Sequence, residues 1–217
     1  MVPKRLLIVG AGGFGREVLC WARDVEPTQS EWELGGFLDA NPAALAGFDV
    51  PLGILGDPAE FTPSATDRFV CAIGDPVIKQ RVMARLADSR AQFSNLIHPS
   101  VVRGANCSIG VGCVLCPGVV LTSHVSLGGF VTLNVAATVG HDVVIGDWCT
   151  LSGHVDITGN VSLGEAVFAG SHACVLPGLR VGDRSVIGAG AVVTRNVPAG
   201  AVMFGVPAKQ ICRRAEK

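Results

Sequence analysis

Between Ile109 and Val193 the sequence repeats with a period of six residues. Fourteen of the fifteen residues in this series are Leu, Ile or Val, and the exception is Ala169. The position two residues earlier in the hexad is small or β-branched in nearly every repeat, as at Cys107 and Val119. The full series is Ile109, Leu115, Leu121, Leu127, Leu133, Val139, Ile145, Leu151, Ile157, Leu163, Ala169, Val175, Val181, Ile187 and Val193.

This fixed period restricts the fold strongly. An α-helix of 3.6 residues per turn would sweep such a series around its axis, and a lone strand alternates every two residues. A period of six is typical of the hexapeptide β-helix, in which short strands meet at corners and aliphatic side chains stack inside a prism. Three hexads per turn predict about five coils of about 18 residues over 101–197. Glycine follows eight residues of the series, and we expect it at corners because it tolerates a positive φ and close backbone approach.

The cysteines fit the same pattern. Cys107, Cys113 and Cys149 occupy the small inward position, where a thiol acts as a compact apolar filler. Cys113 and Cys116 form one Cys-x-x-Cys pair without a second pair, which is weak support for zinc. We therefore predict structural cysteines and no metal site.

Composition excludes several classes of partner. A net charge of −1 with 16% charged residues provides no basic surface for nucleic acid. No apolar run reaches the roughly 18 residues that a membrane span needs. Residues 1–10 begin like a signal peptide, but they lack a convincing cleavage site and continue into a glycine motif. We expect a soluble, cytoplasmic protein without a membrane span.

The amino-terminal third predicts an α/β domain. A strand is expected over 4–9, followed by the motif Gly10-Ala11-Gly12-Gly13-Phe14-Gly15 and a helix over 16–24. The further elements that we expect are strands over 33–38, 67–73 and 93–97 and a helix over 77–87. Together they predict a Rossmann-like βαβ domain over 1–97. The prism would then occupy 98–217 and end in a short helix over 210–217.

The glycine motif favours the binding of one nucleoside diphosphate. A complete dinucleotide-binding domain has about 150 residues and two mononucleotide halves, whereas this domain has little more than one half. A dehydrogenase and a purely structural turn are the weaker interpretations. The phosphates would lie over Gly13, Phe14 and Gly15, where bare N–H groups meet a helix amino terminus.

Residues further along this domain are candidates for the rest of the nucleotide. A ribose-binding acid is expected about 20 residues after such a glycine motif, and Asp39 lies near that place. We expect the ribose or the base near Asp39 and Ala40, and a carboxylate there suits guanine and uracil equally. Lys79 and Arg81 are either solvated helix charges or cations that face the pyrophosphate.

Four motifs occur together in a recognisable order. They are the glycine-rich start, Ala72-Ile73-Gly74, Val139-Gly140-His141-Asp142 and Phe204-Gly205-Val206-Pro207-Ala208-Lys209. Over essentially the whole chain this set resembles the nucleotide-amino-sugar N-acetyltransferases of the left-handed β-helix superfamily, which include GDP-perosamine and bacillosamine-pathway enzymes. The resemblance implies a left-handed coil, a homotrimer and acetyl-CoA between neighbouring prisms. It also implies acetylation of the 4-amino group of a nucleotide-linked sugar, with GDP-perosamine as the best candidate.

The expected chemistry needs a base. Histidine is the side chain best suited to accept an amine proton near neutral pH. His141 lies two residues after the inward Val139, at a corner that projects from the prism, and Asp142 is placed to fix its tautomer. The family's catalytic base matches His141 and its acidic helper matches Asp142, so the resemblance implies direct attack on the thioester without an acyl-enzyme.

The resemblance also suggests residues for acetyl-CoA. Some relatives carry a second histidine nine residues after the base, where this chain has Thr150. A hydrogen bond to the thioester oxygen must then come from the Thr150 hydroxyl or from backbone N–H groups, and we favour the backbone at Gly159. Lys209 or Arg213 would meet the phosphates. The corner residues that we expect along the pantetheine arm are Gly170, Ser171, Gly188 and Ala189.

The remaining histidines carry less information. His154 and His172 are three hexads apart and should stack on successive coils, either near the substrate or as a polar ladder. His124 has no partner nearby in the sequence, and we expect it to be a surface group. We expect His98 to be a residue of the domain junction.

Three alternatives stay open. A sialic-acid-type O-acetyltransferase would use the same base on a hydroxyl acceptor. A metalloenzyme such as a γ-type carbonic anhydrase needs a close histidine pair, and the separation of His141 from His154 along the chain argues against it. A nucleotide sensor that has lost its activity would not need the His141–Asp142 pair.

Overall fold

The structure, a computed structural model, describes residues 4–29 and 32–213. It consists of two compact units, Met1–Pro99 and Ser100–Lys217. No helix within the described ranges combines the length and the apolar character needed to cross a bilayer.

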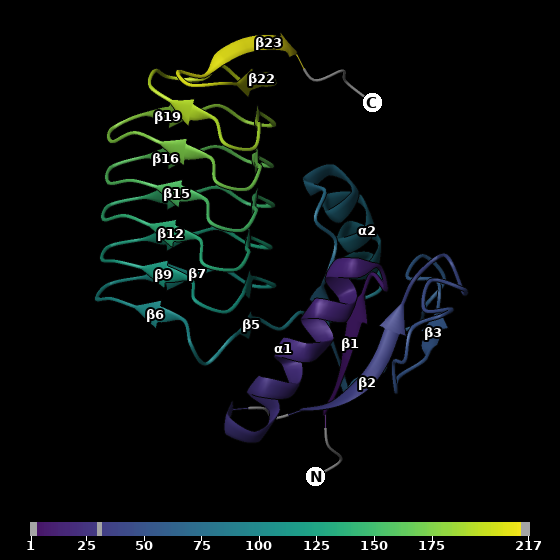
Figure 1. Ribbon diagram of the computed structural model, residues 1–217. Coiled ribbons are helices and arrows are strands. Elements are labelled where there is room, and N and C mark those ends of the chain that lie inside the picture. Colours follow the sequence, from purple (N-terminus) through teal and green to yellow (C-terminus); the bar gives the residue numbers. More distant parts are fainter. Residues whose placement is uncertain (1–3, 30–31, 214–217) are drawn as a thin grey trace. The chain divides into compact units, whose positions relative to one another are not determined.

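The first unit contains a parallel sheet in the order β3-β2-β1-β4. Its strands are β1 (Lys4–Val9), β2 (Trp32–Leu38), β3 (Ile54–Gly56) and β4 (Asp67–Cys71), and the short β5 (Leu96–Ile97) ends the unit. The central strand β1 is drawn in purple in Figure 1, beside β2. This order is one mononucleotide half of a doubly wound fold, in which ligands bind at the carboxyl ends of the strands.

Two helices accompany this sheet, α1 (Gly13–Gln29) and α2 (Pro76–Asp88). The helix α2 begins where the sequence supplies both a cap and a starter residue. The Asp75 side chain accepts hydrogen bonds from the N–H groups of Val77 and Ile78. Pro76 suits the first turn because proline has no backbone N–H group, so no donor is left without an acceptor there. The helix α1 begins earlier than expected, so the last part of the glycine motif forms its first turn.

The structure therefore confirms the predicted strand–glycine–helix order and adds two details. The strand β3 was not predicted, because it is too short to show an alternating pattern. The expected strand over 93–97 is reduced to Leu96–Ile97, while Phe93 makes only an isolated parallel bridge to Phe69.

The second unit is a three-sided prism of stacked coils (Figure 1). Face 1 consists of β6 (Val102–Arg103), β9 (Val120–Leu121), β12 (Thr138–Val139), β15 (Asp156–Ile157), β18 (Cys174–Val175) and β21 (Val192–Val193). Face 2 consists of β7 (Ser108–Ile109), β10 (Ser126–Leu127), β13 (Val144–Ile145), β16 (Ser162–Leu163) and β19 (Arg180–Val181). Face 3 contains β8 (Val114–Leu115), β11 (Thr132–Leu133), β14 (Thr150–Leu151), β17 (Phe168–Ala169), β20 (Val186–Ile187), β22 (Ala201–Phe204) and β23 (Lys209–Arg213).

The register confirms the hexad interpretation. Thr138 pairs in parallel with Val120 on one side and with Asp156 on the other, so each coil contains three hexads. The two inward positions of the hexad are fully buried, as Ala137 and Val139 show. Face 1 has six strands and face 2 has five, close to the predicted number of coils. The predicted fold class, a Rossmann-like α/β unit followed by a left-handed parallel β-helix, is confirmed.

The role of the corner glycines was only half predicted. Positive φ angles occur three residues after the aliphatic series residue, where non-glycine residues such as Asp142 (59°) and Trp148 (66°) adopt them. The glycines that directly follow the series are required by close approach instead. A Cβ on Gly140 would lie 2.7 Å from the Gly159 nitrogen, because successive coils stack there without space for a side chain.

The expected carboxy-terminal helix is wrong over 210–213, and 214–217 lie outside the described residues. The chain instead forms β23 (Lys209–Arg213), which pairs antiparallel with β22. The last coil presents a strand edge whose N–H and C=O groups need partners, and a returning strand supplies them.

Candidate active site

The functional side chains lie on the corners of the prism, which we name by the faces that they join. Corner A joins faces 1 and 2, corner B joins faces 2 and 3, and corner C joins faces 3 and 1. The residues of corner A are 104–107, 122–125, 140–143, 158–161 and 176–179. Those of corner B are 110–113, 128–131, 146–149, 164–167 and 182–185. Those of corner C are 116–119, 134–137, 152–155, 170–173 and 188–191.

His141 and Asp142 form a hydrogen-bonded couple on corner A. The His141 Nδ1 lies 2.8 Å from the Asp142 Oδ2, and both side chains are more than half exposed, at 59% and 53%. A carboxylate only accepts, so Nδ1 carries a proton and the lone pair of a neutral ring remains on Nε2. Asp142 reaches this position because it adopts a φ of 59° and donates its N–H to the Ser123 carbonyl.

The next coil provides a seat for the His141 ring. A Cβ added to Gly159 would lie 2.5 Å from His141 Nε2 and 2.7 Å from Cε1, so the ring fits only because position 159 is glycine. The backbone on both sides is fixed, since Asn160 N–H donates to the His141 carbonyl and Gly178 N–H donates to the Gly159 carbonyl. None of the described residues accepts the N–H of Gly159. The lone pair of Nε2 and an available amide donor thus lie on one patch of corner A.

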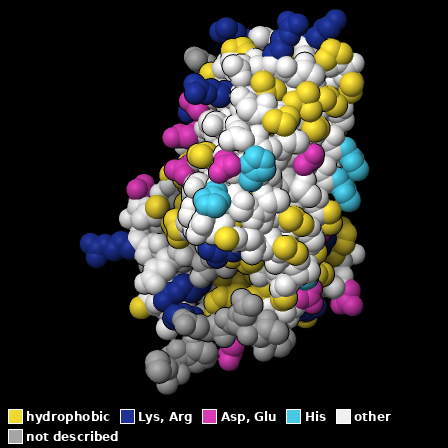
Figure 2. Space-filling model, turned by 90° about the vertical axis from the view of Figure 1, so that its left-hand side faces the viewer, with side chains coloured by type: hydrophobic (Ala, Val, Ile, Leu, Met, Phe, Trp, Pro, Cys, Tyr) yellow, Lys and Arg dark blue, Asp and Glu magenta, His cyan; other side chains and the backbone are white. Residues whose placement is uncertain are grey.

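Other polar groups extend this corner. The Asn106 Nδ2 lies 2.9 Å from the His124 Nε2, one coil apart along the same column. His124 is an exposed surface group, as expected, and its partner comes from the coil repeat rather than from a neighbour in the sequence. Figure 2 shows histidine side chains (cyan) in two separate groups, one near the middle of the view with acidic side chains (magenta) beside it and one at the right-hand edge.

Face 1 contributes an acid and a thiol beside this corner. The Thr138 hydroxyl donates to Asp156 Oδ1 at 2.5 Å, and the Cys174 Sγ lies 3.9 Å from Asp156 Oδ2. Burial raises the pKa of the Cys174 thiol, and the Asp156 charge and hydrogen bond raise it further. Cys174 is therefore held as a thiol, and the sequence pattern did not indicate this pair.

The predicted coenzyme residues lie elsewhere on the prism. Gly170, Ser171, Gly188 and Ala189 are on corner C, across face 1 from His141. Ser171 and Ala189 are exposed, whereas the missing side chains of the two glycines are required by packing. A Cβ on Gly170 would lie 2.6 Å from the Ala189 nitrogen, and one on Gly188 would lie 2.2 Å from the Phe204 ring. His154 and His172 stack on this corner as expected, with ring centroids 4.8 Å apart.

Thr150 and Lys209 are not close to His141 in the topology of one chain. Thr150 lies in β14 on face 3, it is buried, and its hydroxyl has no hydrogen-bond partner within the described part of the chain. Lys209 is exposed at the start of β23, and Arg213 is exposed at its end.

In the first unit, the glycine motif has an open part and a packed part. A Cβ on Gly15 would lie 2.0 Å from the Gly10 carbonyl oxygen, so this glycine allows α1 to approach β1. A Cβ on Gly12 would meet no described atom within 4 Å, and one on Gly13 would meet only an Arg16 nitrogen at 4.0 Å. The space for a ligand is therefore at Gly12 and Gly13. Phe14 packs edge-to-face against Trp21.

Asp39 follows β2 and contacts the glycine motif directly. Its Oδ2 accepts the N–H of Ala11 at 2.7 Å and its Oδ1 accepts the N–H of Asn41 at 2.8 Å. The carboxylate thus stabilises the loop that begins the motif, a role that the sequence did not reveal. Ala40, the next residue, is exposed.

The two predicted cations of α2 differ in environment. Arg81 is exposed, whereas Lys79 is completely buried. Burial raises the pKa of the Cys71 thiol, and the positive charge of Lys79 partly offsets that rise. Lys79 and Cys71 are therefore neighbours in the interior.

Comparison with known proteins links both units to one class of enzyme. Residues 5–86 match the PglD N-terminal domain, and residues 160–195 match the hexapeptide repeat of succinyl-transferase. No curated protein sequence matches the chain.

Several solved structures are similar over nearly the whole chain. PerB from Caulobacter crescentus, in complex with CoA and GDP-perosamine, is 30% identical with a TM-score of 0.86, covering 97% of this chain and 98% of that one. WeeI from Acinetobacter baumannii AYE is 29% identical with a TM-score of 0.86, covering 96% and 100%. The acetyltransferase domain of PglB from Neisseria gonorrhoeae FA1090 is 28% identical with a TM-score of 0.85, again covering 96% and 100%.

These matches agree with the geometry of the two units. The glycine motif opens at the end of a parallel sheet, and the exposed His141–Asp142 couple lies on a prism built from hexads. The chain belongs to the hexapeptide-repeat sugar N-acetyltransferases of the left-handed β-helix superfamily, and it is an acyltransferase.

Proposed function

We propose that the chain transfers the acetyl group of acetyl-CoA to the 4-amino group of a nucleotide-linked amino-deoxy sugar. The observation that carries this proposal is the His141–Asp142 couple seated on Gly159. GDP-perosamine is the best candidate for the acceptor, because PerB was solved with GDP-perosamine and CoA and its chain aligns almost end to end with this one.

The groups on corner A are sufficient for a direct transfer. The amine lone pair attacks the thioester carbonyl while His141 Nε2 accepts an amine proton. The carbonyl oxygen becomes an oxyanion, which the N–H of Gly159 would stabilise. Collapse of this intermediate breaks the C–S bond and releases the coenzyme A thiolate. Asp142 stabilises the positive charge that His141 carries after proton transfer.

A homotrimer would complete the coenzyme site. Within one chain, His141 lies on corner A, whereas Ser171 and Ala189 lie on corner C across face 1. If corner C of a neighbouring subunit faces corner A, acetyl-CoA lies between two prisms. It then contacts His141 of one subunit and the corner C residues of its neighbour. Thr150 and Lys209 are assigned to the coenzyme only in this assembled form.

The first unit is proposed to bind the acceptor nucleotide. The open positions at Gly12 and Gly13 and the start of α1 suit a pyrophosphate, because the helix amino terminus presents N–H groups and a partial positive charge. Phe14 and Gly15 complete this turn. The ribose or base is assigned to the neighbourhood of Asp39 and Ala40.

The charges of α2 divide between surface and interior. Arg81 is exposed, and we assign it as the cation that faces the pyrophosphate. Lys79 is completely buried, so its positive charge would act on the pyrophosphate only from the interior of the unit. We assign the reaction to the cytoplasm, since all eight cysteines are thiols rather than disulfides, as is usual in a reducing compartment.

The test is a thiol-release assay with acetyl-CoA and a panel of GDP-, UDP- and dTDP-linked 4-amino sugars. Each sugar is paired with its 4-hydroxy analogue, which reports O-acetylation. Rapid turnover of one amino sugar supports the proposal and identifies the nucleotide. Turnover of a hydroxy analogue alone would replace it with O-acetylation, and nucleotide binding without any turnover would favour a sensor.

A further inference from the structure

A neutral hydrogen-bonded pair, Asn106 and His124, lies on corner A before the candidate base. The Asn106 Nδ2 lies 2.9 Å from the His124 Nε2, and both side chains are exposed. Both residues adopt a left-handed φ, of 57° and 56°, at the hexad position that Asp142 takes on the next coil. The backbone between the coils is fixed, since the His124 N–H donates to the Ala105 carbonyl. The pair therefore stands in one column with Asp142.

The pair has a defined set of donors and acceptors. An amide nitrogen only donates, so the His124 Nε2 accepts and the ring proton is on Nδ1. Within the described ranges, no residue accepts this Nδ1 proton and none donates to the Asn106 Oδ1. Because its lone pair is occupied, His124 is unsuited to act as a base. The pair instead presents one N–H donor and one carbonyl acceptor to the outside.

A hydroxyl group matches this pair, because it both donates and accepts a hydrogen bond. An apolar ligand would cover the donor and the acceptor without satisfying either of them. A phosphate group would leave the acceptor unused, and its charge would be repelled by the Asp142 carboxylate on the next coil. The chemistry of the pair therefore points to a neutral ligand rich in hydroxyl groups, such as a sugar.

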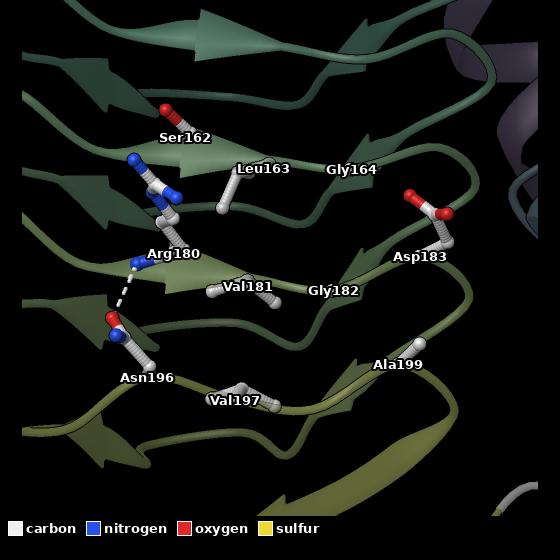
Figure 3. A pocket seen from close by; sticks show the side chains of 10 residues that line it. All are labelled: Ser162, Leu163, Gly164, Arg180, Val181, Gly182, Asp183, Asn196, Val197 and Ala199. Atoms are coloured by element: carbon white, nitrogen blue, oxygen red, sulfur yellow. Dashed lines mark hydrogen bonds between the residues drawn. The ribbon is translucent and has the colours of Figure 1, made fainter.

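The later coils of the prism present different groups. Corner A ends in the exposed Leu176 and Pro177. At the carboxy-terminal end of face 2, the Asn196 Oδ1 accepts the Arg180 N–H at 2.8 Å, and Figure 3 shows Arg180 and Asp183 on opposite sides of a shallow pocket. One end of the prism thus combines an apolar corner with a charged pocket. The neutral pair belongs to the other end.

The distance from the pair to the reactive nitrogen suits one sugar ring. The His141 ring lies over Gly159, which is two coils beyond His124. Two coils extend about 10 Å along the prism, because neighbouring strands lie about 4.8 Å apart. A hydrogen bond at each end takes about 3 Å, which leaves about 4 Å between them. A six-membered ring that uses two substituents on different sides fits this length.

We infer that Asn106 and His124 bind a ring hydroxyl of the acceptor sugar and thereby contribute to acceptor specificity. The inference rests on the proposed function, which puts the 4-amino group at the His141 Nε2. The His124 Nδ1 donates to the hydroxyl oxygen, and the Asn106 Oδ1 accepts the hydroxyl proton. The base and the pair then hold the sugar ring from two sides, which orients the amine for attack.

The first experiment measures binding without turnover. The best amino sugar of the panel and its free nucleoside diphosphate are titrated calorimetrically into the wild type, His124→Ala and the control Arg184→Ala. Arg184 is exposed and has the same hexad position on corner B, with a φ of 57°. Alanine is tolerated at this position, since Ala136 and Ala166 adopt a left-handed φ there.

His124→Ala is expected to weaken binding of the nucleotide sugar about three- to tenfold, as the loss of one neutral hydrogen bond does. Its affinity for the nucleoside diphosphate should be unchanged, because that ligand has no sugar to contact the pair. The control should bind both ligands like the wild type. Equal binding of the nucleotide sugar to all three proteins, or an equal loss for both ligands in His124→Ala, would overturn the inference.

The second experiment separates binding from chemistry. His124→Ala should raise the KM of the acceptor by a similar factor, with little change in kcat or in the KM of acetyl-CoA. Asn106→Ala should have a smaller effect of the same kind, since it only frees the orientation of the His124 ring. A fall in kcat with an unchanged acceptor KM would overturn the inference and make His124 part of the proton transfer.

The two experiments distinguish this inference from the proposed function. If the wild type acetylates no amino sugar, the proposed function fails. The loss of affinity confined to the sugar-bearing ligand then still decides whether the pair binds the sugar. If no nucleotide sugar binds to the wild type, both fail.

Discussion

The His141 ring lies against the Cα of Gly159 on the next coil, with Nε2 only 2.5 Å from the place that a Cβ would occupy. One coil therefore positions the candidate base of the coil before it. The ring is more than half exposed, so it is able to move away if that space is filled.

Gly159→Ala should consequently damage activity more than stability. The new methyl group displaces the exposed ring by an ångström or more, and such misplacement costs about 100-fold in kcat. Circular dichroism and the melting temperature should stay close to those of the wild type. The matched control is Gly129→Ala at the same hexad position on corner B, where a Cβ meets its first neighbour at 3.5 Å. If both variants keep full kcat, Gly159 does not position the base.

Asp142→Asn should lower kcat about 10- to 100-fold, the usual effect of losing a residue that orients a catalytic group. The amide is able to turn its NH₂ group toward Nδ1, which favours the tautomer with its proton on Nε2 and leaves no lone pair there to accept the amine proton. The neutral amide also no longer stabilises the positive charge of the protonated His141 ring. The KM for acetyl-CoA should change little. Steady-state kinetics with Asp142→Glu, which restores the charge, provides the comparison. Wild-type kcat in Asp142→Asn would show that the 2.8 Å contact is not used.

Much of this site was predictable because its determinants are local or periodic. The hexads fix which residues point inward, so His141 had to project from a corner. The coil of three hexads also predicted the stack of His154 on His172, which the structure confirms.

What the sequence did not reveal depends on departures from the period or on contacts between distant segments. The Arg180–Asn196 bond exists because the register slips just before Pro198. The contact of Asp39 with Ala11 joins two strand ends of a parallel sheet. The strand β23 depends on an unpaired edge that only the complete prism creates.

Asp156→Asn should make Cys174 more reactive. Burial, the Asp156 charge and its hydrogen bond all raise the pKa of this thiol. Removing the charge lowers the pKa, so a larger fraction is thiolate and alkylation by iodoacetamide at pH 8 should accelerate roughly two- to tenfold. Peptide mass spectrometry measures the rate, with the exposed Cys212 of the same chain as internal reference. An unchanged ratio of the two rates would show that Asp156 does not control the thiol.

Asp67→Asn should destabilise the first unit by about 1–3 kcal/mol at pH 7. Burial would raise the pKa of Asp67, but hydrogen bonds from Arg5 and Ser64 outweigh it and hold the pKa below its usual value. A carboxyl group whose pKa is lowered by folding stabilises the protein at pH values above its unfolded pKa of ~3.9. This stabilisation is lost as the pH falls through the pKa of the folded state.

The difference between wild type and Asp67→Asn should therefore be largest near neutral pH and shrink below pH ~4. Urea unfolding followed by tryptophan fluorescence at several pH values measures it. Asp88→Asn, an exposed change at the end of α2, serves as the control. A difference that is constant with pH would mean that the carboxylate charge is not the source of the stability.

The most direct test of the whole account is the kcat of His141→Asn for acetyl transfer from acetyl-CoA to GDP-perosamine, or to the best acceptor of the panel. Asparagine occupies similar space but takes no proton. General base catalysis contributes typically about 10²- to 10⁴-fold, so kcat should fall by about that factor while the calorimetric affinity for coenzyme A stays the same. A kcat within a few-fold of the wild type would contradict the assignment of His141 as the base.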